Sequence, residues 1–300
     1  MPLRIAAIEF LNAAPLMWGL EADPRFALAY TLPSACADAL RDGTADLGVI
    51  PAIELARIPG LVGLADLGVA VADQEGAEVR SILLVSRRPP AQVRTVVLDA
   101  ASRTSAVLAQ LLLRRRWGAA AAAVTSVTGA AGAGWREALE TADAVLLIGD
   151  PALQLRVSGA ARHLHVYDLA QEWRAWTGLP FVFALWGIRA PAFEAHRGWL
   201  VARLHAALAA GLEASEELVR MWAPRLQIAP AEVRRYLADN VAYRLTAAHH
   251  HGLRRFVQLA AQEGWIEGAG LPELVAGTAI TAPAGPALTA PASGPAGEVA

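Results

Sequence analysis

The chain has 300 residues, 55% of them hydrophobic and 18% charged, and its formal net charge is −2. That length suits about two domains with separate cores, and without a basic excess we expect no nucleic-acid partner. No apolar run reaches the length of a membrane span, so we expect no membrane partner either. The chain also has no lysine, which excludes Schiff-base chemistry.

The first part of the chain alternates apolar strands with helices, a pattern typical of βαβ units in a parallel sheet. Pro33 and Ser34 open its clearest helix, and Gly43 ends it. Glu9 and Asn12 interrupt the apolar N-terminal stretch, so it is not a secretory signal and we expect a cytoplasmic protein. The predicted strands of this part cover residues 3–10, 26–32, 46–52, 61–72 and 79–87.

A second unit restarts the same alternation after Pro89–Pro90, where we place a crossing between two lobes. Its last strand, 181–188, is interpreted as the return into the first lobe. The predicted lobes are therefore residues 1–87 plus 187–277, and residues 88–186. The other predicted elements of this unit are strands 96–99, 123–127, 144–150 and 163–169, with helices at 104–117, at 135–141 and up to residue 176.

Three helices follow the second unit, at residues 191–216, 230–241 and 246–263. The first of them carries one apolar stripe, as expected of a helix that packs on a core. From residue 278 to residue 300 the chain is dominated by Ala, Gly, Pro, Thr and Ser without any period. That composition cannot build a packed core, so we predict a disordered tail at 278–300.

Two α/β lobes joined by two crossings resemble the two-lobed, type II periplasmic-binding-protein-like fold, which has a central cleft. In open α/β sheets, ligands bind beyond the carboxyl ends of the strands. Residues at the predicted strand ends are therefore candidates for a site in the cleft. These candidates are Asn12, Ile50, Pro51, Ser81, Arg103, Thr104, Ser105, Gly149 and Asp150.

The run Arg103–Thr104–Ser105 lies where a helix is predicted to begin after strand 96–99. Unpaired N–H groups and the helix dipole favour an anion at such a start. Two hydroxyls and a guanidinium would complete a cradle for a carboxylate or a phosphate. The alternative is that Ser102 or Thr104 only caps the helix.

The other polar candidates also have structural alternatives. Asn12 follows a strand and precedes Pro15, where asparagine often bonds its own turn. Ser81 could be a satisfied strand serine, and Asp150 could cap the next helix. Three consecutive residues, His249–His251, cannot converge on one ion from a helix, and no nucleotide-binding motif occurs. We therefore expect no metal and no cofactor.

Six segments taken together resemble the chorismate dehydratase family, which acts in the futalosine route to menaquinone. They occur in the family's order and at matching distances over residues 4–265. No single segment is specific, but six in register are strong evidence for the resemblance. The segments are FLNAAPL, DLGVIPAIEL, VRSILLVS, LDAASRTSAVL, LLIGDPAL and EWRAWTGLPFVFALW.

The resemblance implies a protein that binds chorismate between its lobes and removes water from it, giving 3-[(1-carboxyvinyl)oxy]benzoate. We expect this protein to be a monomer or a homodimer. It matches Asn12 and Ser81 to the polar pair at the reacting ring, and Thr104 and Ser105 to carboxylate-binding hydroxyls. Because the reaction forms an aromatic ring, its driving force is large. We therefore expect a substrate-assisted elimination, in which the substrate's own enolpyruvyl carboxylate takes the ring proton.

Glu9 departs from the family's pattern, which often has a small polar residue at this position. Its carboxylate could be a general base, or it could face away from the site. Strand alternation places Glu9 and Leu11 on one face, and Phe10 and Asn12 on the other, which favours the second interpretation.

Two other functions remain open. A paralogue of the same pathway, 1,4-dihydroxy-6-naphthoate synthase, shares the expected fold, but it would need a Cys–Pro–Asn–Asp-type motif that EFLNAAPL lacks. It would also need a catalytic histidine in the second lobe, where His163 and His165 are poorly placed. A non-catalytic binding protein for an aromatic or dicarboxylic anion would normally carry an export signal.

Overall fold

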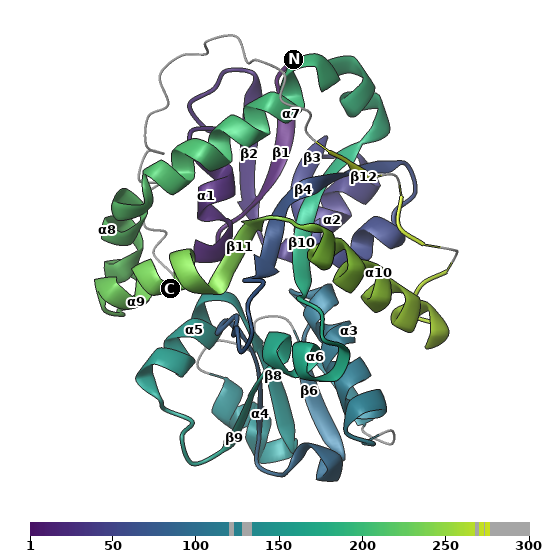
Figure 1. Ribbon diagram of the computed structural model, residues 1–300, viewed down its shortest axis with the longest axis vertical. Helices are drawn as coiled ribbons and strands as arrows, with labels where there is room; N and C mark the ends of the chain where they lie inside the picture. Colours follow the sequence, from purple (N-terminus) through teal and green to yellow (C-terminus); the bar gives the residue numbers. More distant parts are fainter. Residues whose placement is uncertain (120–122, 128–133, 268–269, 273, 277–300) are drawn as a thin grey trace.

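The chain forms two lobes, each built around one β-sheet with helices packed on it (Figure 1). Among the described residues, no helix is long and apolar enough to cross a membrane. The predicted tail, 278–300, lies outside the described part of the chain. This computed structural model describes residues 1–119, 123–127, 134–267, 270–272 and 274–276.

Lobe one contains a seven-stranded sheet with the order β11-β4-β10-β3-β1-β2, and β12 pairs with β4. β1 runs parallel to β2 and β3, as predicted, but β10 is antiparallel to β3 and β4. β10 differs because it returns from the other lobe and enters the sheet at the edge where β1 and β3 end. The strands are β1 (Leu3–Ile8), β2 (Phe26–Thr31), β3 (Leu47–Pro51), β4 (Leu61–Val71), β10 (Val182–Arg189), β11 (Val241–Arg244) and β12 (Leu274–Val275).

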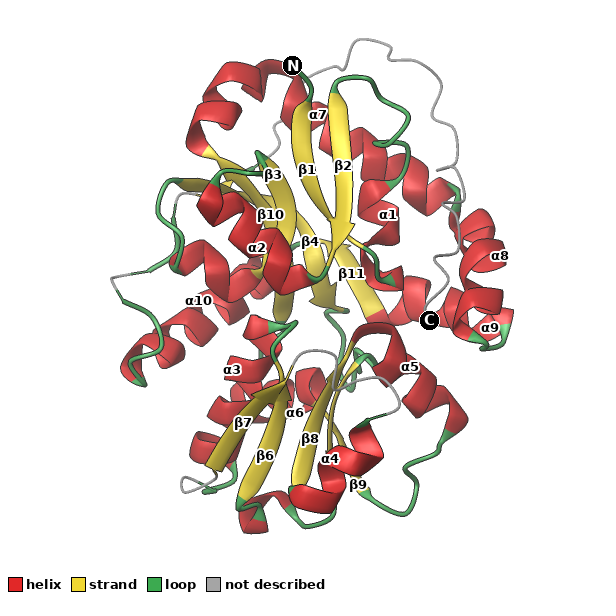
Figure 2. Cartoon of the chain, turned by 180° about the vertical axis from the view of Figure 1, so that it is seen from behind, coloured by secondary structure: helices red, strands yellow, loops and turns green. Residues whose placement is uncertain are grey.

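Lobe two contains a five-stranded sheet with the order β7-β6-β8-β5-β9, seen from behind in Figure 2. β6 pairs in parallel with β7 and β8, whereas β5 is antiparallel to β8 and β9. The carboxyl ends of β6 and β8 therefore point toward lobe one, and the carboxyl ends of β1 and β3 point toward lobe two (Figure 2). The strand ends of the two sheets thus face each other. The strands are β5 (Ile82–Ser86), β6 (Thr95–Asp99), β7 (Ala123–Val127), β8 (Ala144–Ile148) and β9 (His165–Asp168).

The boundaries between the lobes differ from the predicted ones at residues 87 and 187. β5 belongs to the sheet of lobe two, so the first crossing lies between Val71 and Ile82. The pair Pro89–Pro90 instead leads into a short turn that connects β5 to β6 within lobe two. β10 belongs to lobe one from Val182 onward, so the return crossing also comes before its predicted place.

The helices cover both sheets, and most begin and end where the sequence indicates. Pro33 occupies the first turn of α2, and Gly43 ends that helix with a left-handed φ of 74°, the conformation that glycine adopts without strain. The helical elements of lobe one are η1 (Leu11–Ala13), α1 (Ala14–Met17), α2 (Pro33–Asp42), η2 (Ala52–Ala56), α7 (Ala190–Glu213), α8 (Ser215–Leu226), α9 (Pro230–Arg235), η5 (Tyr236–Asn240) and α10 (Ala247–Gln262). Those of lobe two are η3 (Pro90–Gln92), α3 (Arg103–Leu111), η4 (Leu112–Arg116), α4 (Trp135–Thr141), α5 (Gly149–Ser158) and α6 (Leu169–Thr177).

Among the elements absent from the sequence-based prediction are the helix α8 and the strand β11. α8 follows α7 directly, and β11 begins at Val241, where a predicted helix was expected to end. β11 pairs with the edge of β4, with Val241 opposite Val71. This pairing is a tertiary interaction, which outweighs the local preference of a four-residue segment.

An aromatic cluster joins the lobes near the return crossing. Trp173 of α6 is fully buried, and its ring lies 5.3 Å from that of Phe181 and 6.2 Å from that of Phe256 on α10. Both contacts are edge-to-face, a favourable geometry for aromatic rings. This packing holds the end of lobe two against lobe one next to the return crossing.

Candidate functional site

A cavity of about 40 Å³ lies between the lobes, where the strand ends of both sheets meet. Lobe one contributes Phe10 and Asn12, which follow β1, and Pro51 at the end of β3. Lobe two contributes Ser102, which precedes α3, and Gly149, which begins α5. The rest of the lining is mainly apolar, as is usual for small-molecule sites.

Three predicted site residues line this cavity directly, namely Asn12, Pro51 and Gly149. Phe10, which strand alternation placed on the Asn12 face, lines it as well. The aromatic ring of Phe10 lies so close to Gly149 that a Cβ there would meet it at 3.0 Å. With a φ of +66°, Gly149 is also in the left-handed region, so both its backbone and its lack of a side chain are required.

Three further predicted residues lie beside the cavity without lining it. Ser81 precedes the cavity-lining Ile82 and is 1% exposed. Thr104 and Ser105 are fully buried in the first turn of α3. The hydroxyls of Ser105 and Ser102 form a hydrogen bond at 2.8 Å. Ser105 therefore contacts a residue that lines the cavity but does not line the cavity itself. Of the three candidates Asn12, Ser81 and Ser105, only Asn12 therefore lines this cavity.

The structure corrects two predicted substrate contacts. Ile50 is fully buried, and its side chain packs beneath Gly187 of β10. Because side chains alternate along a strand, Pro51 faces the cavity and Ile50 faces the core. The Arg103 guanidinium points instead toward Asp38 and Glu54 of lobe one, at 2.7 and 3.1 Å.

Sequence analysis missed one polar group of the site, Tyr236. Its hydroxyl donates a hydrogen bond to Ser81 Oγ at 2.7 Å. The Asn12 side chain lies near the same phenol and opposes the rise in its pKa caused by burial. Tyr236 thus bonds to one member of the predicted polar pair and lies near the other. No local motif around position 236 marks it, because its partner Ser81 is 155 residues away.

Two helices of lobe two begin at the cavity. Ser102 caps α3, since its hydroxyl accepts the N–H of Ser105 at 3.4 Å. Ser102 therefore both caps α3 and lines the cavity. α5 begins at Gly149, which also lines the cavity. The positive ends of two helix dipoles thus face one small space, an arrangement that favours negatively charged groups.

Asp150 links the first turn of α5 to lobe one. The backbone N–H of Leu11 donates to Asp150 Oδ1 at 3.1 Å, and this bond supports the turn that carries Asn12. Burial raises the pKa of Asp150 to about 7. The carboxyl group is therefore partly protonated at neutral pH and repels a neighbouring anion less than a free carboxylate would.

The raised pKa of Asp150 predicts how stability changes with pH. Between about pH 4 and pH 7 the folded protein holds a proton that the unfolded chain has lost, so this group lowers stability as pH rises. Asp150→Asn keeps an acceptor for Leu11 but does not titrate. We expect the variant to match the wild type near pH 3 and to be more stable by roughly 4 kcal/mol at pH 8, measured by urea denaturation. A difference that stays constant with pH would contradict this account.

Glu9 faces solvent rather than the cavity. Its carboxylate accepts a hydrogen bond from Arg225 at 2.8 Å, and its side chain is 59% exposed. The structure therefore agrees with the interpretation that Glu9 faces away. In addition, no group of three or more His, Cys, Asp or Glu side chains is arranged to hold a metal among the described residues.

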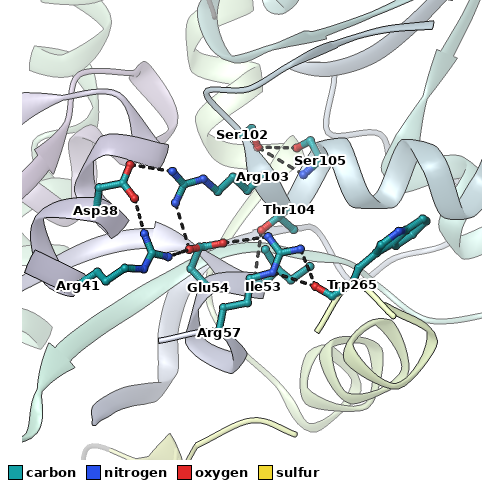
Figure 3. A network of polar contacts seen from close by, with 10 residues as sticks. All are labelled: Asp38, Arg41, Ile53, Glu54, Arg57, Ser102, Arg103, Thr104, Ser105 and Trp265. Carbon is teal, nitrogen blue, oxygen red and sulfur yellow. Dashed lines mark hydrogen bonds and ion pairs between the residues drawn. The ribbon is translucent and has the colours of Figure 1, made fainter. Parts of the chain in front are cut away.

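A polar network next to the cavity connects the lobes (Figure 3). Glu54 is 1% exposed and pairs with Arg41 at 2.5 Å and Arg57 at 3.0 Å within lobe one. Arg103 reaches the same carboxylate from lobe two. Thr104 adds a second link, because its hydroxyl accepts the backbone N–H of Ile53 at 3.2 Å. These contacts hold the lobes together on one side of the cavity.

The two α/β lobes, with a site at facing strand ends and helix starts, define a protein of the periplasmic-binding-protein-like class. A solved Archaeoglobus fulgidus protein has a TM-score of 0.72 with 15% identity, covering 88% of this chain and 98% of that one. The alkanesulfonate-binding protein SsuA from Xanthomonas axonopodis pv. citri has a TM-score of 0.64 with 16% identity, covering 92% and 98%. At these identities the likeness concerns the fold alone.

The sequence comparisons identify the family more narrowly. A family model described as menaquinone biosynthesis matches residues 3–262, and the chain belongs to this family. A chorismate dehydratase from Thermus thermophilus is 28% identical over 281 residues, which cover 86% of this chain and 94% of that protein.

Proposed function

We propose that this protein is a chorismate dehydratase, a hydro-lyase that converts chorismate into 3-[(1-carboxyvinyl)oxy]benzoate and water. The observation that carries the proposal is that Asn12 and two helix starts line one interlobe cavity, with the hydrogen-bonded Ser81–Tyr236 pair directly beside it. Chorismate has two carboxylates, and two helix N-termini suit a dianion. Membership of a menaquinone-biosynthesis family and the similarity to a chorismate dehydratase support the same function.

The proposed reaction breaks one C–H bond and one C–O bond of the ring. The enolpyruvyl carboxylate of the substrate takes the ring proton, and the ring hydroxyl on the adjacent carbon leaves. That hydroxyl and one proton form the single water, while the electron pair of the C–H bond completes the aromatic ring. Asn12 and Ser81 hold and polarise the departing hydroxyl, which stabilises the charge that develops on it.

Binding of this substrate requires the lobes to move apart. The cavity measures about 40 Å³, whereas sites for small molecules typically measure about 300–1,000 Å³. The lobes meet directly around the cavity, for example where Ser34 N–H donates to the Ala101 carbonyl at 3.0 Å. We infer that chorismate binds to a more open arrangement, which then closes to exclude water.

The direct test is to incubate the purified protein with chorismate and follow the ultraviolet spectrum. We expect the diene absorption to decay and a substituted benzoate to accumulate in an equal amount. Unchanged chorismate together with a raised melting temperature would indicate a binding protein instead. Unchanged chorismate without a thermal shift would count against both functions and favour the paralogous naphthoate synthase or another substrate.

A further inference from the structure

The segment that first crosses between the lobes runs to Ser81 and is held by the C-terminal helices of lobe one. Asn240, at the end of η5, contacts this segment twice. Its backbone carbonyl accepts the N–H of Ala72 at 3.2 Å, and its side-chain amide donates to the carbonyl of Glu78 at 2.9 Å. The crossing segment is therefore attached to η5 at two points, Ala72 and Glu78, the second of them three residues before Ser81.

Arg80 continues this attachment in a strained conformation directly before Ser81. Its φ of 63° lies in the left-handed region, which a residue with a side chain adopts only when its surroundings impose it. Its N–H donates to Asp168 at 2.6 Å, and its guanidinium pairs with Glu232 of α9 at 2.7 Å. Glu232 lies four residues before Tyr236, so both face the same side of the helix.

Ser81 and Tyr236 form the next contact along the same two segments. Both are 1% exposed, and the phenol donates to the serine hydroxyl at 2.7 Å. Burial raises the pKa of Tyr236 well above its usual value, so the phenol keeps its proton. Because the serine oxygen accepts this hydrogen bond, the serine O–H is available to donate to a different acceptor. Ile82, the next residue, lines the cavity.

We propose that Tyr236 is a positioning residue that orients the Ser81 hydroxyl, so that Ser81 directs its proton to the departing hydroxyl of the substrate. This inference rests on the proposed dehydration and deepens it. Tyr236 acts through Ser81, and the Arg80–Glu232 pair holds α9 in the register that brings the phenol to it.

A double-mutant cycle tests this role. Tyr236→Phe keeps the ring and removes only the hydroxyl, and we expect kcat on chorismate to fall about tenfold while KM changes by less than twofold. Ser81→Ala should lower kcat by about 100-fold. Because Tyr236 acts through Ser81, adding Tyr236→Phe to Ser81→Ala should cost less than a further twofold. A full additional tenfold loss in the double variant would overturn the proposal.

Tyr243 supplies the matched control. It is also a buried tyrosine, 4% exposed, and within the described part of the chain its hydroxyl has no hydrogen-bond partner. Tyr243→Phe should leave kcat unchanged. The wild type assayed alongside separates the two claims. An inactive wild type would count against the proposed function, whereas an active wild type and an equally active Tyr236→Phe variant would overturn the positioning role alone.

Discussion

Replacing Asn12 with alanine is expected to lower kcat on chorismate by about 100- to 1,000-fold, the usual cost of losing one preorganised donor. Asn12 lines the cavity, so its amide is already at the site before substrate binds. A preorganised donor stabilises charge on a leaving hydroxyl without reorganising during the reaction. The loss should therefore fall mainly on kcat, and it is measured by benzoate formation at saturating chorismate.

Stability measurements are the control for Asn12→Ala. Asn12 follows β1 and is only partly buried, while the neighbouring bond from Leu11 N–H to Asp150 does not depend on its side chain. We expect the melting temperature to change by less than about 3 °C, which corresponds to less than about 1 kcal/mol for a chain of this size. If the variant kept kcat within threefold of the wild type, Asn12 would have no part in the elimination.

Local signals in the sequence were sufficient to place several residues of the site. Asn12 and Pro51 come directly after short apolar strands, and strand ends that face a cleft can be inferred from the alternation of strands and helices. Gly149 follows a third such strand, and a glycine at that point suits a left-handed start to a helix. These three residues line the cavity.

Sequence analysis misassigned Arg103 and missed Tyr236, because the role of each is determined by partners that are distant in the sequence. Arg103 was assigned to the substrate because a guanidinium at a helix start suits a carboxylate, but Asp38 and Glu54 provide that carboxylate from within the chain. Tyr236 is recognisable only once η5 is packed beside the crossing segment that ends at Ser81. Neither contact leaves a periodic or local pattern in the sequence.

The position of the first crossing also depends on contacts between segments that are distant in the sequence. The strand 82–86 is apolar throughout, so its composition suits either sheet, and only its pairing with β8 and β9 assigns it to lobe two. The pair Pro89–Pro90 is a strong local break, but a break between strands of one sheet looks the same in sequence as a break between domains.

Reversing the charge of Arg103 is expected to raise KM for chorismate by about 100-fold with a smaller change in kcat. Arg103 joins lobe two to Asp38 and Glu54 of lobe one, and its side chain is 28% exposed. Each ion pair of this exposure is worth about 0.5–1 kcal/mol. Arg103→Glu loses two pairs and adds two repulsions, for a total of about 3 kcal/mol against closure. When the closed state is less populated, apparent affinity falls by the same factor.

Arg41→Glu is the matched control, because Arg41 pairs with the same two carboxylates but belongs to the same lobe as they do. It should lower the melting temperature without raising KM more than about threefold. Small-angle scattering without substrate distinguishes closure from direct contact with the ligand. Of the two variants, Arg103→Glu alone should increase the radius of gyration, because Arg103 pairs across the lobes and Arg41 pairs within lobe one. Equal effects of the two variants on KM would show that the network stabilises lobe one and does not control closure.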